Sequence, residues 1–255
     1  MARLLVGATL LLSGLGGCQR LEATEELASP VVAQGLYLGL EVPDGVDIEG
    51  TDLLQYSAAC TVFLAYVSDP SALEDAPLEE AGVAFRSDEN EALPFAEEGD
   101  GKYLVTASDG LVYQPGDTAQ VSISTGSEEA TLSVDAPEAP TVDLAPIMTP
   151  RVDFTIDISG QGYDNLIVAV YDVQYNKITW QNLPETVGET YTYTHGEAAV
   201  ESVTVPGTAL PGEGSYLIGV AGMEMADAST FAGANQTLSA FMAGQFALRY
   251  VITQF

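Results

Sequence analysis

Apolar and polar residues alternate along much of the chain after Pro30, a period of two that is typical of strands burying one face. The alternation is strict over residues 119–123 and 152–158. The predicted strands are residues 36–42, 61–67, 82–86, 102–107, 119–123, 130–134, 152–158, 166–172, 177–180, 190–194, 202–205, 216–221 and 245–252. Glycine and proline turns separate them, and no long segment has a convincing helical period. We therefore predict an all-β fold in which sheets pack face to face as sandwiches.

A proline-rich stretch divides this pattern into two parts of similar size. Residues 137–150 hold four prolines, and proline removes a backbone donor and disfavours central strands. We predict a linker there, between an acidic β-sandwich over residues 31–136 and a second β-sandwich over residues 151–255. Each part has about the size of an immunoglobulin-type sandwich.

The chain opens with a basic residue and an apolar run over residues 4–12. This run is too short to span a hydrocarbon core, which needs about 20 residues, and is typical of a secretory signal. Its end, Leu15, Gly16, Gly17 and Cys18, resembles the lipobox of bacterial lipoproteins. The resemblance implies a signal peptide over residues 1–17, cleavage between Gly17 and Cys18, and a lipid on Cys18. The alternative is an ordinary signal peptide in which Cys18 is incidental.

Residues 18–30 are polar and acidic, and we expect them to form a short tether behind the lipid. Two or three acyl chains give stable membrane anchoring, whereas one does not. Gln19 follows the cysteine, a pattern that in enteric lipoproteins goes with the outer membrane. We therefore expect the lipidated N-terminus to hold the protein in the bacterial cell envelope, at the outer membrane. The sequence leaves open which face it occupies.

The charge balance is strongly acidic, and most of the acid precedes Pro146. The formal net charge is −30, from 37 acidic and 7 basic residues, while 47% of the residues are hydrophobic. Such a content of apolar residues is ample for a packed core. Because phosphate binding depends on lysine and arginine, the charge argues against nucleic-acid partners.

Cys60 is the only cysteine besides Cys18. If Cys18 carries a lipid, the chain has no intramolecular disulfide. Free cysteine packs like a small hydrophobic residue, and the neighbours of Cys60 are apolar. We expect Cys60 to be buried; an intermolecular or reactive role is the alternative.

No motif of a catalytic site is present. The sequence lacks GxSxG, HExxH, CxxC and a P-loop, which position nucleophiles, metals and phosphates. His195 is the only histidine, so sites that need two imidazoles are excluded, and we expect it in an exposed hairpin turn. Glycosidases use a pair of carboxylates, but among 37 acidic residues the sequence does not single out such a pair. We therefore expect no enzymatic activity.

One acidic segment offers the oxygen ligands that calcium prefers. Asp44, Asp47, Glu49 and Asp52 are its carboxylates, although they do not fit the EF-hand spacing. The alternative is a plain solvated loop. We expect no other cofactor.

A group of aromatic residues offers a candidate ligand site. If residues 190–194 form a strand, Tyr191 and Tyr193 share a face with His195, and Trp180 belongs to a nearby predicted strand. Exposed rings of this kind stack on sugars or on a partner chain. The alternative is cross-strand packing inside the sandwich.

Three further segments resemble known β-sandwich modules. Residues 100–124, DGKYLVTASDGLVYQPGDTAQVSIS, resemble the later half of transthyretin-like or carboxypeptidase-regulatory-like modules. Residues 162–172 and 211–222 resemble fibronectin type III or other immunoglobulin-like modules. The resemblances imply scaffold, adhesion or assembly roles. We therefore predict a lipid-anchored, non-catalytic binding or structural protein of the envelope, with an envelope protein or a glycan as partner. The alternative is a carbohydrate-binding or carbohydrate-active lipoprotein.

Overall fold

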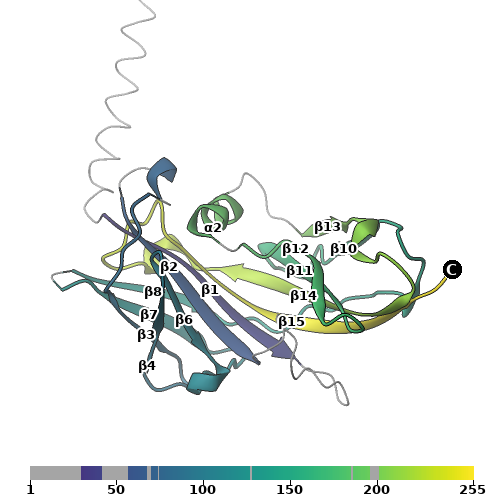
Figure 1. Cartoon of the computed structure of the whole chain (residues 1–255). Helices are drawn as coiled ribbons and strands as arrows, with labels where there is room; N and C mark the ends of the chain where they lie inside the picture. The colour runs from purple at the N-terminus through teal and green to yellow at the C-terminus, as the bar shows by residue number, and fades with distance from the viewer. Residues whose placement is uncertain are drawn as a thin grey trace, which may run out of the picture.

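The computed structural model describes residues 30–41, 57–67, 70–73, 75–126, 128–184, 186–195 and 201–255. Those residues contain fifteen strands, one α-helix and four short 3-10 helices (Figure 1). The all-β fold class is therefore confirmed.

The largest sheet combines strands from the beginning, middle and end of the sequence. Its strands in spatial order are β12 (Lys177–Gln181), β11 (Asn165–Asp172), β14 (Gly214–Met225), β15 (Ala240–Thr253), β1 (Val31–Glu41), β2 (Ala58–Tyr66), β6 (Lys102–Thr106) and β5 (Ala96–Gly99), and β9 (Ile147–Met148) also pairs with β15.

Strand β15 lies at the centre of this sheet. It pairs antiparallel with β14 from Met242 to Thr253, and its first eight residues pair in parallel with residues 34–41 of β1. Parallel strands need a long connection, and here the partners are separated by about 200 residues. Backbone hydrogen bonds therefore join the first described strand to the last.

A second sheet packs on one face of the large sheet and closes a sandwich. Its strands in spatial order are β4 (Leu93–Pro94), β3 (Gly82–Arg86), β7 (Thr118–Ser124) and β8 (Glu129–Asp135). Between the sheets lies a core of apolar side chains in which Tyr37 from β1 meets Phe85 from β3, with ring centroids 4.8 Å apart. Offset aromatic pairs at this distance add to the stability that burial provides.

A smaller two-stranded sheet covers the other half of the large sheet. It consists of β10 (Phe154–Asp157) and β13 (Ser202–Val205). Ile156 and Val205 from this small sheet pack with Val168, Val220 and Val251 from β11, β14 and β15. The fold thus has two apolar cores on one continuous sheet.

The predicted domain boundary falls where the large sheet is continuous. Residues 137–150 contain the short strand β9, and strands from both sides of this stretch pair along β1 and β15. The division into two domains stays a prediction. Two such units would share backbone hydrogen bonds along the pairing of β1 with β15.

The helices of the described residues are short. They are η1 (Pro70–Ala72), η2 (Ala107–Asp109), α2 (Val187–Thr194), η3 (Gly207–Ala209) and η4 (Ala228–Thr230). Among the described residues, no helix has the length and apolar character needed to cross a membrane.

Several predicted strands are confirmed, although only residues 154–157 of the strand predicted over residues 152–158 form a strand, β10. Residues 82–86 and 202–205 are strands with the predicted bounds, and residues 119–123 lie within β7. Asp100 and Gly101 form the turn between β5 and β6, with φ of 51° and 71°. At Gly101 a side chain would overlap the carbonyl oxygen of Leu64. This overlap explains why glycine occupies the position.

The strand predicted over residues 190–194 is wrong, because this segment belongs to helix α2. Thr186 caps the helix by accepting a hydrogen bond from the amide of Glu189 at 3.1 Å. Thr190 and Thr194 then donate from their hydroxyls to the carbonyls four residues earlier. Threonine favours strands through its branched side chain, but these hydroxyls have partners in the helix, and the half-buried Tyr191 and Tyr193 pack on the large sheet. Tertiary contacts thus outweigh the local preference.

We expect Gly39→Ala to destabilise the sandwich by about 1–3 kcal/mol, the usual cost of overpacking a core. A methyl group at this position of β1 would overlap the ring of Tyr113, which is buried and donates from its hydroxyl to the carbonyl of Pro137 at 2.9 Å. Urea unfolding measures the change. Gly212→Ala, where a methyl group meets nothing within 4 Å, is the matched control, and equal stability of both variants would contradict the packing described here.

Candidate functional site

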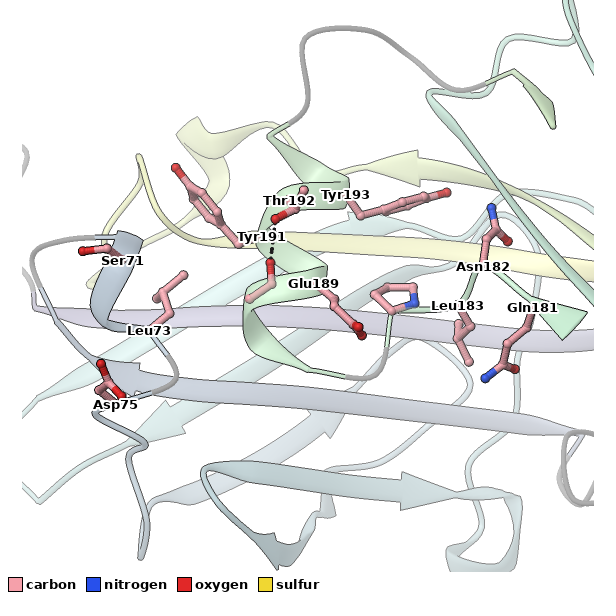
Figure 2. Close-up of a pocket in the computed structure, with 12 residues that line it drawn as sticks. Ser71, Leu73, Asp75, Gln181, Asn182, Leu183, Glu189, Tyr191, Thr192 and Tyr193 are labelled. Atoms are coloured by element: carbon pink, nitrogen blue, oxygen red, sulfur yellow. Dashed lines mark hydrogen bonds between the residues drawn. The ribbon is translucent and has the colours of Figure 1, made fainter. Parts of the chain in front are cut away.

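A pocket of about 780 Å³ lies beside helix α2, and we call it the α2 pocket. Its walls come from three segments: η1 with the residues after it, the end of β12 with the residues after it, and α2 itself (Figure 2). The lining residues are Ser71, Leu73, Asp75, Gln181, Asn182, Leu183, Pro184, Gly188, Glu189, Tyr191, Thr192 and Tyr193. Ligand pockets commonly have volumes of roughly 300–1,000 Å³.

Helix α2 lies on the face of the large sheet opposite the second sheet (Figure 1). Along β1, Tyr37 belongs to the sandwich core, whereas Val32 and Leu36 point to the side of α2. Tyr191 packs on the group that contains Val32, and Tyr193 packs on the group that contains Leu36. The two tyrosines therefore fix the helix to the sheet at two places.

A buried glutamine lies beneath α2. The side chain of Gln34 on β1 is fully buried and donates from Nε2 to the carbonyl of Leu238. Its Oε1 lies 3.4 Å from the hydroxyl of Thr194, at the end of α2, whose one proton is shared between this oxygen and the carbonyl of Thr190. Buried polar groups need such partners, so Gln34 links the strand, the helix and the segment before β15.

The structure places the three predicted aromatic site residues in different surroundings. Tyr191 and Tyr193 line the α2 pocket, but they are two positions apart on a helix and point in opposite directions (Figure 2). Trp180 pairs across the sheet with Val170 and packs on the core beneath β10 and β13. The expectation that the tyrosines share one face with His195 is therefore wrong, because it depended on a strand. Ligand binding by Trp180, Tyr191 and Tyr193 stays a prediction.

His195 ends helix α2 and does not lie in a hairpin turn, although it is exposed as predicted. Its ring stacks on the ring of Tyr191, with centroids 4.2 Å apart, and its Nδ1 lies 2.7 Å from the hydroxyl of Thr194. Desolvation lowers the pKa of His195, while hydrogen bonds with the backbone of Tyr191 and Thr237 oppose this shift. The neutral ring that packs on Tyr191 is therefore favoured.

The charged residues that line the α2 pocket are Asp75 and Glu189, and both are exposed. None of the described lysine, arginine or histidine residues belongs to the lining. The pocket is thus an acidic one that also contains apolar and amide groups.

A second hollow, of about 400 Å³, is also acidic. It contains Asp135, Asp164, Glu224 and Asp227. Burial raises the pKa of Glu224, and the carboxylates of Asp135 and Asp164 raise it further. Among the described residues, no group of three or more side chains is arranged to hold a metal ion.

Several predicted residues lie outside the described part of the chain. They are the lipidation site Cys18 with its neighbour Gly17, and the calcium candidates Asp44, Asp47, Glu49 and Asp52. Cys60 is described and is buried, as predicted, and burial raises the pKa of its thiol well above the ordinary value. A protonated thiol in an apolar core is unreactive.

Sequence reasoning missed most of the pocket. Ser71, Leu73 and Asp75 follow β2, whereas Gln181 and Leu183 are more than 100 residues later. Only tertiary structure brings these segments together. The useful local pattern was the pair of Thr186 and Glu189, because threonine followed three residues later by glutamate is a helix start.

No protein-family model matches this chain, and no curated protein sequence matches it. Solved structures with similarity include domains A168–A170 of titin, at 12% identity over 77% of this chain and 59% of that chain, with a TM-score of 0.22. The FN1–FN3 domains of chicken CNTN1 are 10% identical over 76% and 62%, with a TM-score of 0.23. Titin domains I67–I69, in an E-to-A mutated variant, are 8% identical over 88% and 66%, with a TM-score of 0.24. This chain thus spans less than two thirds of each solved chain, and the fold class stands on its own strands and sheets.

We expect Thr186→Ala to loosen helix α2 by about 1 kcal/mol, since a lost N-cap leaves a backbone amide without its side-chain acceptor. Amide hydrogen exchange over residues 187–194 measures the local opening. Thr186→Ser retains the capping oxygen and should exchange like the wild type. Unchanged exchange in the alanine variant would show that the cap contributes nothing to the helix.

Proposed function

We propose that this chain is a lipid-anchored, non-catalytic binding protein of a bacterial cell envelope, and that the α2 pocket holds its ligand. The observation that carries the proposal is the pocket itself. Residues 71–75 and, more than 100 positions later, residues 181–193 converge on an open volume of about 780 Å³ and present hydroxyl, amide, carboxylate and apolar groups to it. A concave site with a few converging polar groups is where proteins of this size bind ligands.

The lining supports binding more than catalysis. Its hydroxyl groups include those of Ser71 and Thr192, and Thr192 donates to the carbonyl of Gly188. A nucleophilic hydroxyl needs an adjacent base, whereas the hydroxyl of Thr192 is held by a backbone carbonyl.

The position of the pocket agrees with an anchored protein. One wall is formed by η1, which follows β2, and Tyr66 near the end of β2 pairs with Val31 at the start of β1. The predicted tether, residues 18–30, leads directly into Val31. That wall is therefore at the end of the body where the tether joins it.

Carbohydrate binding is a second candidate. The side chains of Gln181 and Thr192 and the ring of Tyr191 are groups that hydrogen-bond to sugar hydroxyls and stack on sugar rings. Trp180 does not add to this surface, because it packs on the core beneath β10 and β13.

Replacing Cys18 with serine should abolish lipid attachment, because only the thiol forms the thioether. We expect wild-type protein from cells grown with radiolabelled palmitate to carry label and to partition into detergent. The Cys18→Ser variant should be unlabelled. Label on the serine variant would place the lipid elsewhere and contradict the anchor.

A photoreactive benzoylphenylalanine in place of Thr192 should form a light-dependent adduct in intact cells, because Thr192 is exposed and lines the pocket. The captured molecule should bind purified full-length protein, and Thr192→Trp should weaken that binding at least tenfold by filling the pocket.

Ser122, exposed on β7 and outside the lining, provides the matched position. The same photoreactive group there should give no such adduct, and Ser122→Trp should bind like the wild type. Equal adducts from both positions, or none from position 192, would contradict the proposal that this pocket holds the ligand.

A further inference from the structure

The described charged residues that line the α2 pocket are all acidic. Asp75 and Glu189 contribute carboxylates from different walls, and no described basic residue lines the pocket. The whole chain carries a formal net charge of −30, so the field at the pocket attracts cations and repels anions. An anionic ligand would need compensating positive groups in the lining, which has none among the described residues.

The pocket also has an apolar surface beside these carboxylates. Leu183 and Tyr191 are half-buried and belong to the lining, and Leu73, which is only 2% exposed, supports Tyr191 from below as part of the buried group under α2. Lysine and arginine side chains cover such surface with their methylene groups while the charged head reaches a carboxylate.

The lining residues extend along α2 and are not gathered at one point. Figure 2 shows Asp75 near η1, Gln181 on the far side near β12, and Glu189 between them. Helix α2 has eight residues and is therefore about 12 Å long. An extended peptide covers that length with about four residues.

We infer that the α2 pocket binds an extended cationic peptide segment that contains both lysine or arginine and apolar residues. This inference rests on the proposed function of the pocket and names its ligand class. The cationic heads pair with Asp75 and Glu189, and the apolar parts lie on Leu183 and Tyr191. A single metal ion would not use the apolar surface, and a neutral sugar would not use the charge.

The test uses full-length protein in a neutral detergent and a fluorescein-labelled hexapeptide of the sequence Lys-Lys-Leu-Leu-Lys-Lys, which presents lysine and leucine on both faces when extended. Fluorescence anisotropy should show saturable binding to the wild type. Asp75→Asn combined with Glu189→Gln should weaken this binding at least tenfold. Glutamine is accepted at the third position of a helix start, so the capping of α2 by Thr186 is kept, and thermal melting checks that the variant is folded.

A matched pair separates local recognition from the overall charge. Asp88→Asn with Glu91→Gln changes the net charge equally, and both residues are exposed in the loop between β3 and β4, outside the pocket lining. We expect this pair to change the affinity less than twofold. A peptide with glutamate in place of lysine should not bind. Equal losses from both pairs would reduce the binding to general attraction by an acidic protein and overturn the inference.

The outcomes also separate this inference from the function on which it rests. If no cationic peptide binds, but the Thr192 position still captures a ligand such as a neutral glycan, the peptide inference fails and the binding function stands. If no peptide binds and no ligand is captured, both fail.

Discussion

The parallel pairing of β1 with β15 is the contact on which the rest of the structure depends. Along β15, Phe241 and Ala243 enter the sandwich core, while Ala247 and Val251 enter the core beneath β10 and β13. All four are odd-numbered and point to one face of the strand. A single strand therefore supplies both cores, and its hydrogen bonds to β1 join the strands that surround each of them.

The α2 pocket lies on the opposite face of the large sheet, where β1 pairs with β15. Residues from β1, β14 and β15 form the apolar surface on which Tyr193 packs, and Val32 with Phe63 forms the surface under Tyr191. Because α2 is only eight residues long, it would be marginal in water by itself. The sheet gives the helix its conformation, and the helix in turn gives the sheet a concave, acidic surface with groups from three parts of the sequence.

How much of this the sequence reveals depends on how each strand is buried. Strands with one buried face, such as β7, alternate and were predicted almost to the residue. β14 and β15 are buried on both faces over most of their length, so they lack alternation and only parts of them were found. The same limit applies to the site: Tyr191 was singled out, but the helix that turns it away from Tyr193 depends on contacts with β1 and β2. Asp75 had no local feature that marked it, since its role comes from a neighbour more than 100 residues away.

The central place of β15 also has a consequence for biogenesis. Synthesis from the N-terminus delivers β1 and β2 long before residues 240–253, and Ala33 and Ser239, which share a hydrogen bond, are 206 positions apart. Until residues 240–253 are available, the edge of β1 that β15 will occupy presents unpaired amide and carbonyl groups, and such edges promote aggregation. Contacts this distant in sequence also slow folding. A nascent chain of this design therefore gains from a holding chaperone that shields β1 until its partner strand arrives.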